Sequence, residues 1–284
     1  MVGKVYSEDP SIRRRLRSLI VIWLQNIQRK DFMSQLFEVR VYGKNRKKPP
    51  DGGRSYWSDI ESWKSRRFKE VGQYPVTVNV TSRSANWGES LSPMFLGPVK
   101  TYMEGSTMRS AVNVEVVWQY SKVYTQEKVG KELRPLWFTG KDGNPNERWF
   151  EWRNKAWSNP EFSYTHGKFA ENKSKIRRAF PKGSKVGYWF WEGRKLDQVS
   201  ARREIYGRIY SQEVKKTDAF QKLQEILTQS DLLIYDIDGY DYLELGMTPE
   251  DTIRDLNHSW GHGLVLSFLL NGIDPVTLGG ANHG

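Results

Sequence analysis

The stretch N-V-E-V-V-W-Q-Y-S-K-V-Y, residues 113 to 124, raises the central question of the fold, because polar side chains interrupt an apolar run at regular spacing. Glu115, Gln119 and Lys122 are separated by four and by three residues. In a helix, these spacings place all three polar groups in one stripe on an otherwise apolar surface, and such a helix has to be buried. The alternating β-branched residues favour a strand instead, in which Lys122 faces away from the other two. The segment alone leaves both structures open.

The polar groups of this segment have a functional and a structural interpretation. A buried carboxylate loses its hydration, which raises its pKa towards neutrality and suits it to act as a general base. Alternatively, Glu115, Gln119 and Lys122 form a network that only satisfies its own hydrogen bonds, or Glu115 faces solvent from a strand. The residue pattern by itself does not separate these cases.

The composition of the 284 residues favours anionic partners. There are 44 Lys and Arg residues against 33 Asp and Glu residues, which gives a formal net charge of +11. Such a charge suits nucleic acid, nucleotides or an acidic membrane surface. The chain has no cysteine, which excludes disulfides and thiolate chemistry and is compatible with a reducing compartment. We therefore expect a cytoplasmic protein.

The first ninety residues combine two helical and two strand-like patterns. Residues 13–31 have a basic start and a short apolar run, which is too short to span a bilayer and lacks a cleavage site. We expect an amphipathic helix docked on the core and no membrane partner, with a helix lying on a membrane surface as the alternative. Residues 36–42 and 76–80 read as strands, and 58–68 as a helix. We expect residues 1–90 to form an extension packed on the core.

The remainder of the chain is dominated by helical periodicity. Residues 147–157 and 259–270 have helical spacing, and 197–229 form a long helical stretch with a break or kink near Gly207. Residues 231–243 form a short apolar run that leads into an acidic turn. Together these patterns predict one α+β domain that is mainly α-helical and has a few short strands.

Residues 115–123, E-V-V-W-Q-Y-S-K-V, resemble a helix of the NADAR family, which comprises N-glycosidases acting on ADP-ribose-type compounds. That helix reads Glu, His, two aromatic or apolar residues, Gln, two variable residues and Lys, and Val116 stands here in place of the usual His. Further stretches follow in the family's order, namely a Ser-Pro-aromatic loop at 91–99, a long basic helix at 203–227 and a closing block at 232–242 and 260–270.

The resemblance implies a divergent NADAR-like domain over residues 91–284, with a basic aromatic insertion at about 130–195. The implied activity is hydrolysis of the ribose–base N-glycosidic bond of an ADP-ribosylated nucleic acid or a related nucleotide, without a cofactor or a metal. The implied catalytic residues are Glu115 and one of Asp238 and Asp241, because Asn257 stands where the family usually has its Asp. The implied substrate-binding residues are Trp118, Gln119, Lys122, Trp260, Gly261 and Gly263.

The insertion supplies cations and flat rings, which phosphate backbones and unstacked bases require. We therefore expect single-stranded nucleic acid as a further partner, contacted by Trp152, Arg153, Lys155, Arg177 and Arg178. The competing interpretation is a non-catalytic nucleic-acid-binding or interaction protein on the same scaffold, for example a viral accessory or counter-defence factor.

Two other motifs have competing interpretations. Residues 232–240 imitate the D-x-D-G motif of haloacid-dehalogenase-like phosphatases, although that motif normally opens its domain and only 44 residues follow Tyr240 here. His258 and His262 have the spacing of zinc ligands, but the other ligands of a zinc site do not accompany them. Both are weaker than the NADAR resemblance.

Overall fold

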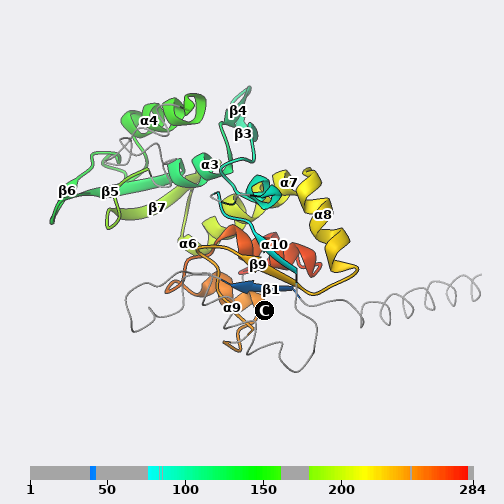
Figure 1. Cartoon of the computed structure of the whole chain (residues 1–284). Coiled ribbons are helices and arrows are strands. Elements are labelled where there is room, and N and C mark those ends of the chain that lie inside the picture. Colours follow the sequence, from blue (N-terminus) through cyan, green and yellow to red (C-terminus); the bar gives the residue numbers. More distant parts are fainter. Residues whose placement is uncertain are drawn as a thin grey trace, which may run out of the picture.

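The computed structural model describes most of the chain after residue 75 (Figure 1). The helices predicted at 13–31 and 58–68, as well as Arg177 and Arg178, lie outside the described residues. The described residues are 39–42, 76–82, 84, 86–160, 179–243 and 245–280.

A parallel sheet of three strands pairs two strands from the early part of the described chain with one from its late part. Strand β9 (Leu232–Tyr235) lies between β1 (Val39–Tyr42) and β2 (Val76–Asn79). All four residues of β9 are buried, as expected of a central strand in a parallel sheet that is covered on both faces. The helix α10 (His262–Leu270) is buried along seven of its nine residues and packs against β1 and β9.

The three parallel strands end at the same edge of the sheet. Beyond the strands, the backbone of Val80 donates to the carbonyl of Tyr235 (3.0 Å), and Asp236 donates to the carbonyl of Tyr42 (2.9 Å). The segment after β2 and the acidic turn after β9 are therefore neighbours. In open α/β sheets, ligands bind outside the carboxyl ends of the strands, so we expect a ligand-binding site at this edge of the sheet.

The segment 113–124 divides into a helix and a strand. Helix α3 (Val114–Tyr120) begins after Asn113, whose side chain accepts a hydrogen bond from the backbone of Val116 (2.9 Å). Strand β5 begins at Lys122. The single stripe of Glu115, Gln119 and Lys122 that the helical alternative required does not form, because the helix ends two residues before Lys122.

The expectation of a mainly α-helical protein is also wrong. Of the described residues, 37% are helical and 25% form strands in three sheets, so the fold is mixed α+β. The second sheet is the hairpin of β3 (Val99–Glu104) and β4 (Thr107–Ala111). The third has the antiparallel order β6-β5-β7-β8, with the bounds Glu132–Pro135, Lys122–Val129, Lys185–Trp191 and Arg194–Leu196. Strand β5 pairs with the sequence-distant β7, and such pairing leaves little trace in the local sequence pattern.

The helical stretch predicted at 197–229 is built from four consecutive pieces. The helical stretch is interrupted at 215–217. There the Thr217 side chain caps the last piece by accepting a hydrogen bond from the backbone of Phe220 (3.1 Å). Gly207, near which the break or kink was predicted, lies inside a π-helical piece. The pieces are α6 (Gln198–Ala201), the π-helical segment Arg202–Gly207, α7 (Arg208–Val214) and α8 (Asp218–Leu227).

Two further helices are α4 and α9. Helix α4 (Glu147–Ser158) packs against α3 and β4, and α9 (Pro249–Arg254) precedes α10. None of the helices in the described ranges combines the length and the apolar surface needed to cross a membrane.

Candidate functional site

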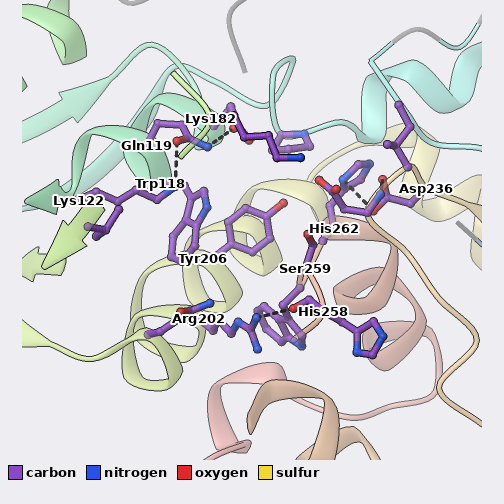
Figure 2. A pocket seen from close by; sticks show the side chains of 18 of the residues that line it. Trp118, Gln119, Lys122, Lys182, Arg202, Tyr206, Asp236, His258, Ser259 and His262 are labelled. Atoms are coloured by element: carbon purple, nitrogen blue, oxygen red, sulfur yellow. Dashed lines mark hydrogen bonds and ion pairs between the residues drawn. The ribbon is translucent and has the colours of Figure 1, made fainter. Parts of the chain in front are cut away.

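A cavity of about 610 Å³ lies at the carboxyl edge of the parallel sheet (Figure 2). Its walls come from the segments after β2 and β9, from α3, from the π-helical segment, from the start of α10 and from the insertion. The structure thus brings together residues that are more than a hundred positions apart in the sequence. The predicted site residues among its lining are Glu115, Trp118, Gln119, Lys122, Asp238, Trp260 and Gly261.

The Glu115 carboxylate belongs to a chain of hydrogen bonds on the cavity wall. Gln119 Nε2 donates to Glu115 Oε1 (2.8 Å), and Lys122 Nζ donates to Gln119 Oε1 (2.9 Å). The Lys122 ammonium also lies 5.0 Å from the centre of the Trp118 ring. The hydrogen-bonded network that the sequence suggested therefore forms, although Lys122 reaches it from the first residue of a strand.

Glu115 holds its proton more tightly than an ordinary glutamate. Burial raises the pKa of Glu115, the hydrogen bond from Gln119 and the charge of Lys122 lower it in part, and the nearby Asp238 carboxylate raises it again. The net effect is a raised pKa. A carboxylate in this state is a stronger base than one in water, which is the property a general base requires.

The structure separates the two aspartates between which the sequence did not decide. Asp238 is exposed, lines the cavity and acts on Glu115 through its charge. Asp241 is buried, and its Oδ2 accepts from Arg40 Nε (3.0 Å) and from Arg40 Nη2 (2.6 Å). Asp241 is absent from the cavity lining. Only Asp238 is therefore placed to act beside Glu115.

Asp236 is a residue of the site that the sequence analysis did not select. It is buried, and its Oδ2 accepts from the backbone of Gly263 (2.9 Å), so it caps the start of α10. His262 Nε2 donates to the carbonyl of Val80 (2.8 Å), and His262 Nδ1 lies 3.3 Å from Asp236 Oδ2. The available signal was its position, because Asp236 directly follows a fully apolar strand whose carboxyl end faces the site.

The two glycines near the start of α10 make room for Asp236. A Cβ at Gly261 would lie 2.6 Å from Asp236 Oδ2, and one at Gly263 would lie 2.6 Å from Asp236 Cβ. These distances are shorter than real Cβ contacts. The glycines were predicted to bind substrate, but in the structure they let a protein carboxylate approach the helix end.

The indole rings at the cavity differ in how much of their surface is free. Trp260 is only 7% exposed and packs edge-on against Tyr206 and, tilted, against Phe268. Trp118 is partly exposed and stacks on Trp189, with ring centroids 5.3 Å apart. Trp118 therefore offers the cavity more ring surface than Trp260.

The π-helical segment contributes two side chains that the sequence analysis did not select. Arg202 donates to the carbonyls of Ile253 (2.9 Å), Asp255 (2.8 Å) and His258 (2.8 Å), so it holds the loop after α9 against the cavity. Tyr206 lies four residues further on and also lines the cavity. A spacing of four within a predicted helix was the available signal for this pair.

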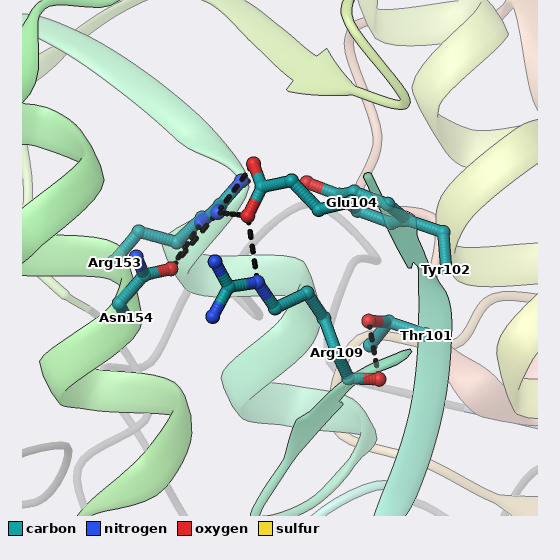
Figure 3. Close-up of polar contacts among 6 residues, drawn as sticks. All are labelled: Thr101, Tyr102, Glu104, Arg109, Arg153 and Asn154. Carbon is teal, nitrogen blue, oxygen red and sulfur yellow. Dashed lines mark hydrogen bonds and ion pairs between the residues drawn. The ribbon is translucent and has the colours of Figure 1, made fainter. Parts of the chain in front are cut away.

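Two of the predicted nucleic-acid contacts lie in the core of the insertion. Trp152 is buried, and Arg153 is 0% exposed. Arg153 Nη1 donates to the Tyr102 hydroxyl (2.5 Å), and Nη2 donates to both oxygens of Glu104 (3.2 Å each), which links α4 to β3 (Figure 3). Lys155, on the same helix, is exposed. Trp152 and Arg153 therefore fix α4 to the rest of the fold, and Lys155 alone of these three remains accessible.

Comparison with protein-family models and with curated protein sequences finds no match to this chain.

We predict that Arg153→Met destabilises the protein by about 3 kcal/mol, because a buried charge network loses its central partner. Arg134, whose ion pair with Glu132 is exposed, provides the matched control. Arg134→Met should change the free energy of unfolding by less than about 0.5 kcal/mol. Urea unfolding followed by tryptophan fluorescence measures both, and equal losses in the two variants would contradict the structural role of Arg153.

We also predict that Glu115→Gln stabilises the protein at neutral pH. Because the folded-state pKa of Glu115 is raised above its ordinary value near 4.5, the carboxyl favours folding below that value. This contribution is lost as the pH rises through the folded-state pKa, at a rate of up to about 1.4 kcal/mol per pH unit. The free energies of unfolding of the two proteins should therefore diverge above about pH 4.5 and then run parallel. Glu151→Gln, at an exposed position of α4, provides the control variant.

Proposed function

We propose that the chain is a NADAR-like N-glycosidase, which hydrolyses the bond between a ribose and a base in an ADP-ribosylated nucleic acid or a related nucleotide. The observation that carries this proposal is the Glu115 carboxylate on the cavity wall, oriented by Gln119 and with a raised pKa. Asp238 lies in the same cavity, so a second carboxylate is available for the reaction.

The proposed reaction needs a carboxylate at the anomeric carbon. As the carbon–nitrogen bond breaks, its electron pair leaves with the base, and positive charge develops on the sugar. Glu115 stabilises that charge and accepts a proton from the attacking water, whose oxygen forms the new bond to the anomeric carbon. The proton that Glu115 accepts is then passed through water beside Asp238 to the departing base, which restores the Glu115 carboxylate. Gln119 holds the Glu115 carboxylate in position throughout.

The walls of the cavity fit the remainder of such a substrate. A volume of about 610 Å³ is in the range of small-molecule sites. The partly exposed Trp118 offers a ring face for a base. Lys182, from the insertion, extends over the cavity in Figure 2 and supplies a cation for a phosphate. The formal net charge of +11 supports an anionic substrate as well.

The first experiment is mass spectrometry on protein incubated with ADP-ribosylated guanine in single-stranded DNA, in RNA and as a free nucleotide. We expect wild-type protein to release ADP-ribose from at least one of these, and Glu115→Gln to lower the rate by about 10²- to 10⁴-fold. Glu151→Gln should retain the wild-type rate, because Glu151 is exposed on α4 and is not part of the cavity lining.

The result that contradicts the proposal is a folded wild-type protein that releases no ADP-ribose from any of the three substrates. Oligonucleotide binding that weakens steeply with salt and is unchanged by Glu115→Gln would then favour the non-catalytic binding protein. The observation that favours nucleic-acid binding as a second candidate function is the net charge of +11.

The pH dependence gives a separate prediction. Because Glu115 must be ionised to act as a base, kcat/KM should fall as the pH is lowered through its raised pKa. The positive charge of Lys122 lowers that pKa, so Lys122→Met should move the acidic limb of the profile to higher pH. If the acidic limb of the kcat/KM profile lies at the same pH in wild type and Lys122→Met, a group other than Glu115 controls the rate.

A further inference from the structure

The ring of Tyr206 is held rigidly at the inner end of the cavity. Only 5% of the residue is exposed. The ring meets Trp118 and Trp260 edge-on, with centroid distances of 5.3 and 6.1 Å, and stacks on Tyr210 at an interplanar angle of 6°. It belongs to a π-helical segment, and such segments often occur at functional sites. The position of the hydroxyl is therefore fixed by packing on several sides.

The hydroxyl of Tyr206 is open to the cavity. Within the described part of the chain, no group forms a hydrogen bond with it, and it is not one of the polar atoms sealed in the core. Figure 2 shows the ring among the lining residues, with its hydroxyl directed into the cavity. The next tyrosine in the helix is different, because the Tyr210 hydroxyl donates to the carbonyl of Leu91 (2.7 Å). Buried hydroxyl groups normally have a partner, so Tyr206 is poised to bind one from a ligand.

The charges around Tyr206 limit what that ligand group can be. Burial and the nearby carboxylates of Glu115, Asp236 and Asp238 raise the pKa of Tyr206 well above its ordinary value, so the phenol remains a neutral donor. A phosphate is anionic and only accepts hydrogen bonds, which makes it a poor match for a place next to three carboxylates. A sugar hydroxyl accepts from a phenol and at the same time donates to a carboxylate, so it matches both kinds of group.

We propose that Tyr206 is a sugar-binding residue, whose hydroxyl donates a hydrogen bond to a hydroxyl of the ribose that is attacked beside Glu115. The same ribose hydroxyl donates to a neighbouring carboxylate. This inference rests on the proposed glycosidase function and deepens it, because it assigns the inner end of the cavity to the reacting ribose. The phosphates then lie towards the mouth, near Lys182.

The test compares Tyr206→Phe with Tyr210→Phe by isothermal titration calorimetry, with ADP-ribose and ADP as probes. Only ADP-ribose carries the second ribose. Loss of one hydrogen bond should weaken ADP-ribose binding to Tyr206→Phe by about 2- to 10-fold, while ADP binding stays unchanged. Tyr210→Phe should retain the wild-type affinity for ADP-ribose but show a lower Tm, because its hydroxyl bonds to the backbone. Tyr206→Phe should keep the wild-type Tm, since no protein partner in the described residues is lost.

Each other outcome has a definite meaning. Equal affinity of wild type and Tyr206→Phe for ADP-ribose overturns the role of Tyr206 and leaves the glycosidase proposal standing. An equal loss of affinity for ADP and ADP-ribose overturns the assignment of this end of the cavity to the ribose. Failure of folded wild-type protein to bind ADP-ribose at all overturns both this inference and the proposed function.

Discussion

The carboxylate of Asp236 is the interaction on which the arrangement of the site depends. It lies at the end of the central strand β9, caps the start of α10 through the backbone of Gly263 and contacts His262, which in turn bonds to Val80 after β2. A negative group at a helix start is favourable, because the helix dipole and the free N–H groups both face it. Two strand ends and one helix start thereby meet at a single carboxylate, and Gly261 and Gly263 are small enough to permit it.

Buried arginines make long-range contacts that hold the fold together around this junction. Arg202 holds the end of α9 and the loop after it by bonding to the carbonyls of Ile253, Asp255 and His258, and Arg153 fixes α4 to strand β3 through Tyr102 and Glu104. Arg40 holds Asp241 behind the junction. These buried arginines bind groups of the protein itself, so their charges stabilise the frame. At these three positions, positive charge of the kind that suggested nucleic acid is used inside the fold.

The sequence suggested a polar network of Glu115, Gln119 and Lys122 as one of several alternatives, and it could not choose among them because Lys122 belongs to a strand that pairs with the distant β7. The sequence also located the segments of β1, β2, α4 and α10 from their local composition and spacing. It failed for the antiparallel sheet β6-β5-β7-β8, whose strands pair across a long stretch of chain, and for Trp152 and Arg153, whose burial depends on contacts with distant segments. Asp236 was missed as a site residue because its cap on a helix 27 residues away is a long-range contact, although its position directly after an apolar strand was a local signal.

Buried polar groups without a protein partner occur in two settings here, and the difference between them bears on function. In the described residues, the indole nitrogens of Trp152, Trp189 and Trp260 lack hydrogen-bond partners and are buried, although other atoms of Trp189 and Trp260 line the cavity. Their cost is offset by the packing of large rings. The Tyr206 hydroxyl, which has no hydrogen-bond partner among the described residues, is instead open to the cavity. The Glu115 carboxylate lines the same cavity with a hydrogen bond from Gln119, and the pKa of each group is raised by burial. Burial of the Tyr206 hydroxyl and the Glu115 carboxylate contributes little to the stability of the fold. Because both groups face a cavity in which a ligand could bond to them, ligand binding or catalysis explains their position better than stability does.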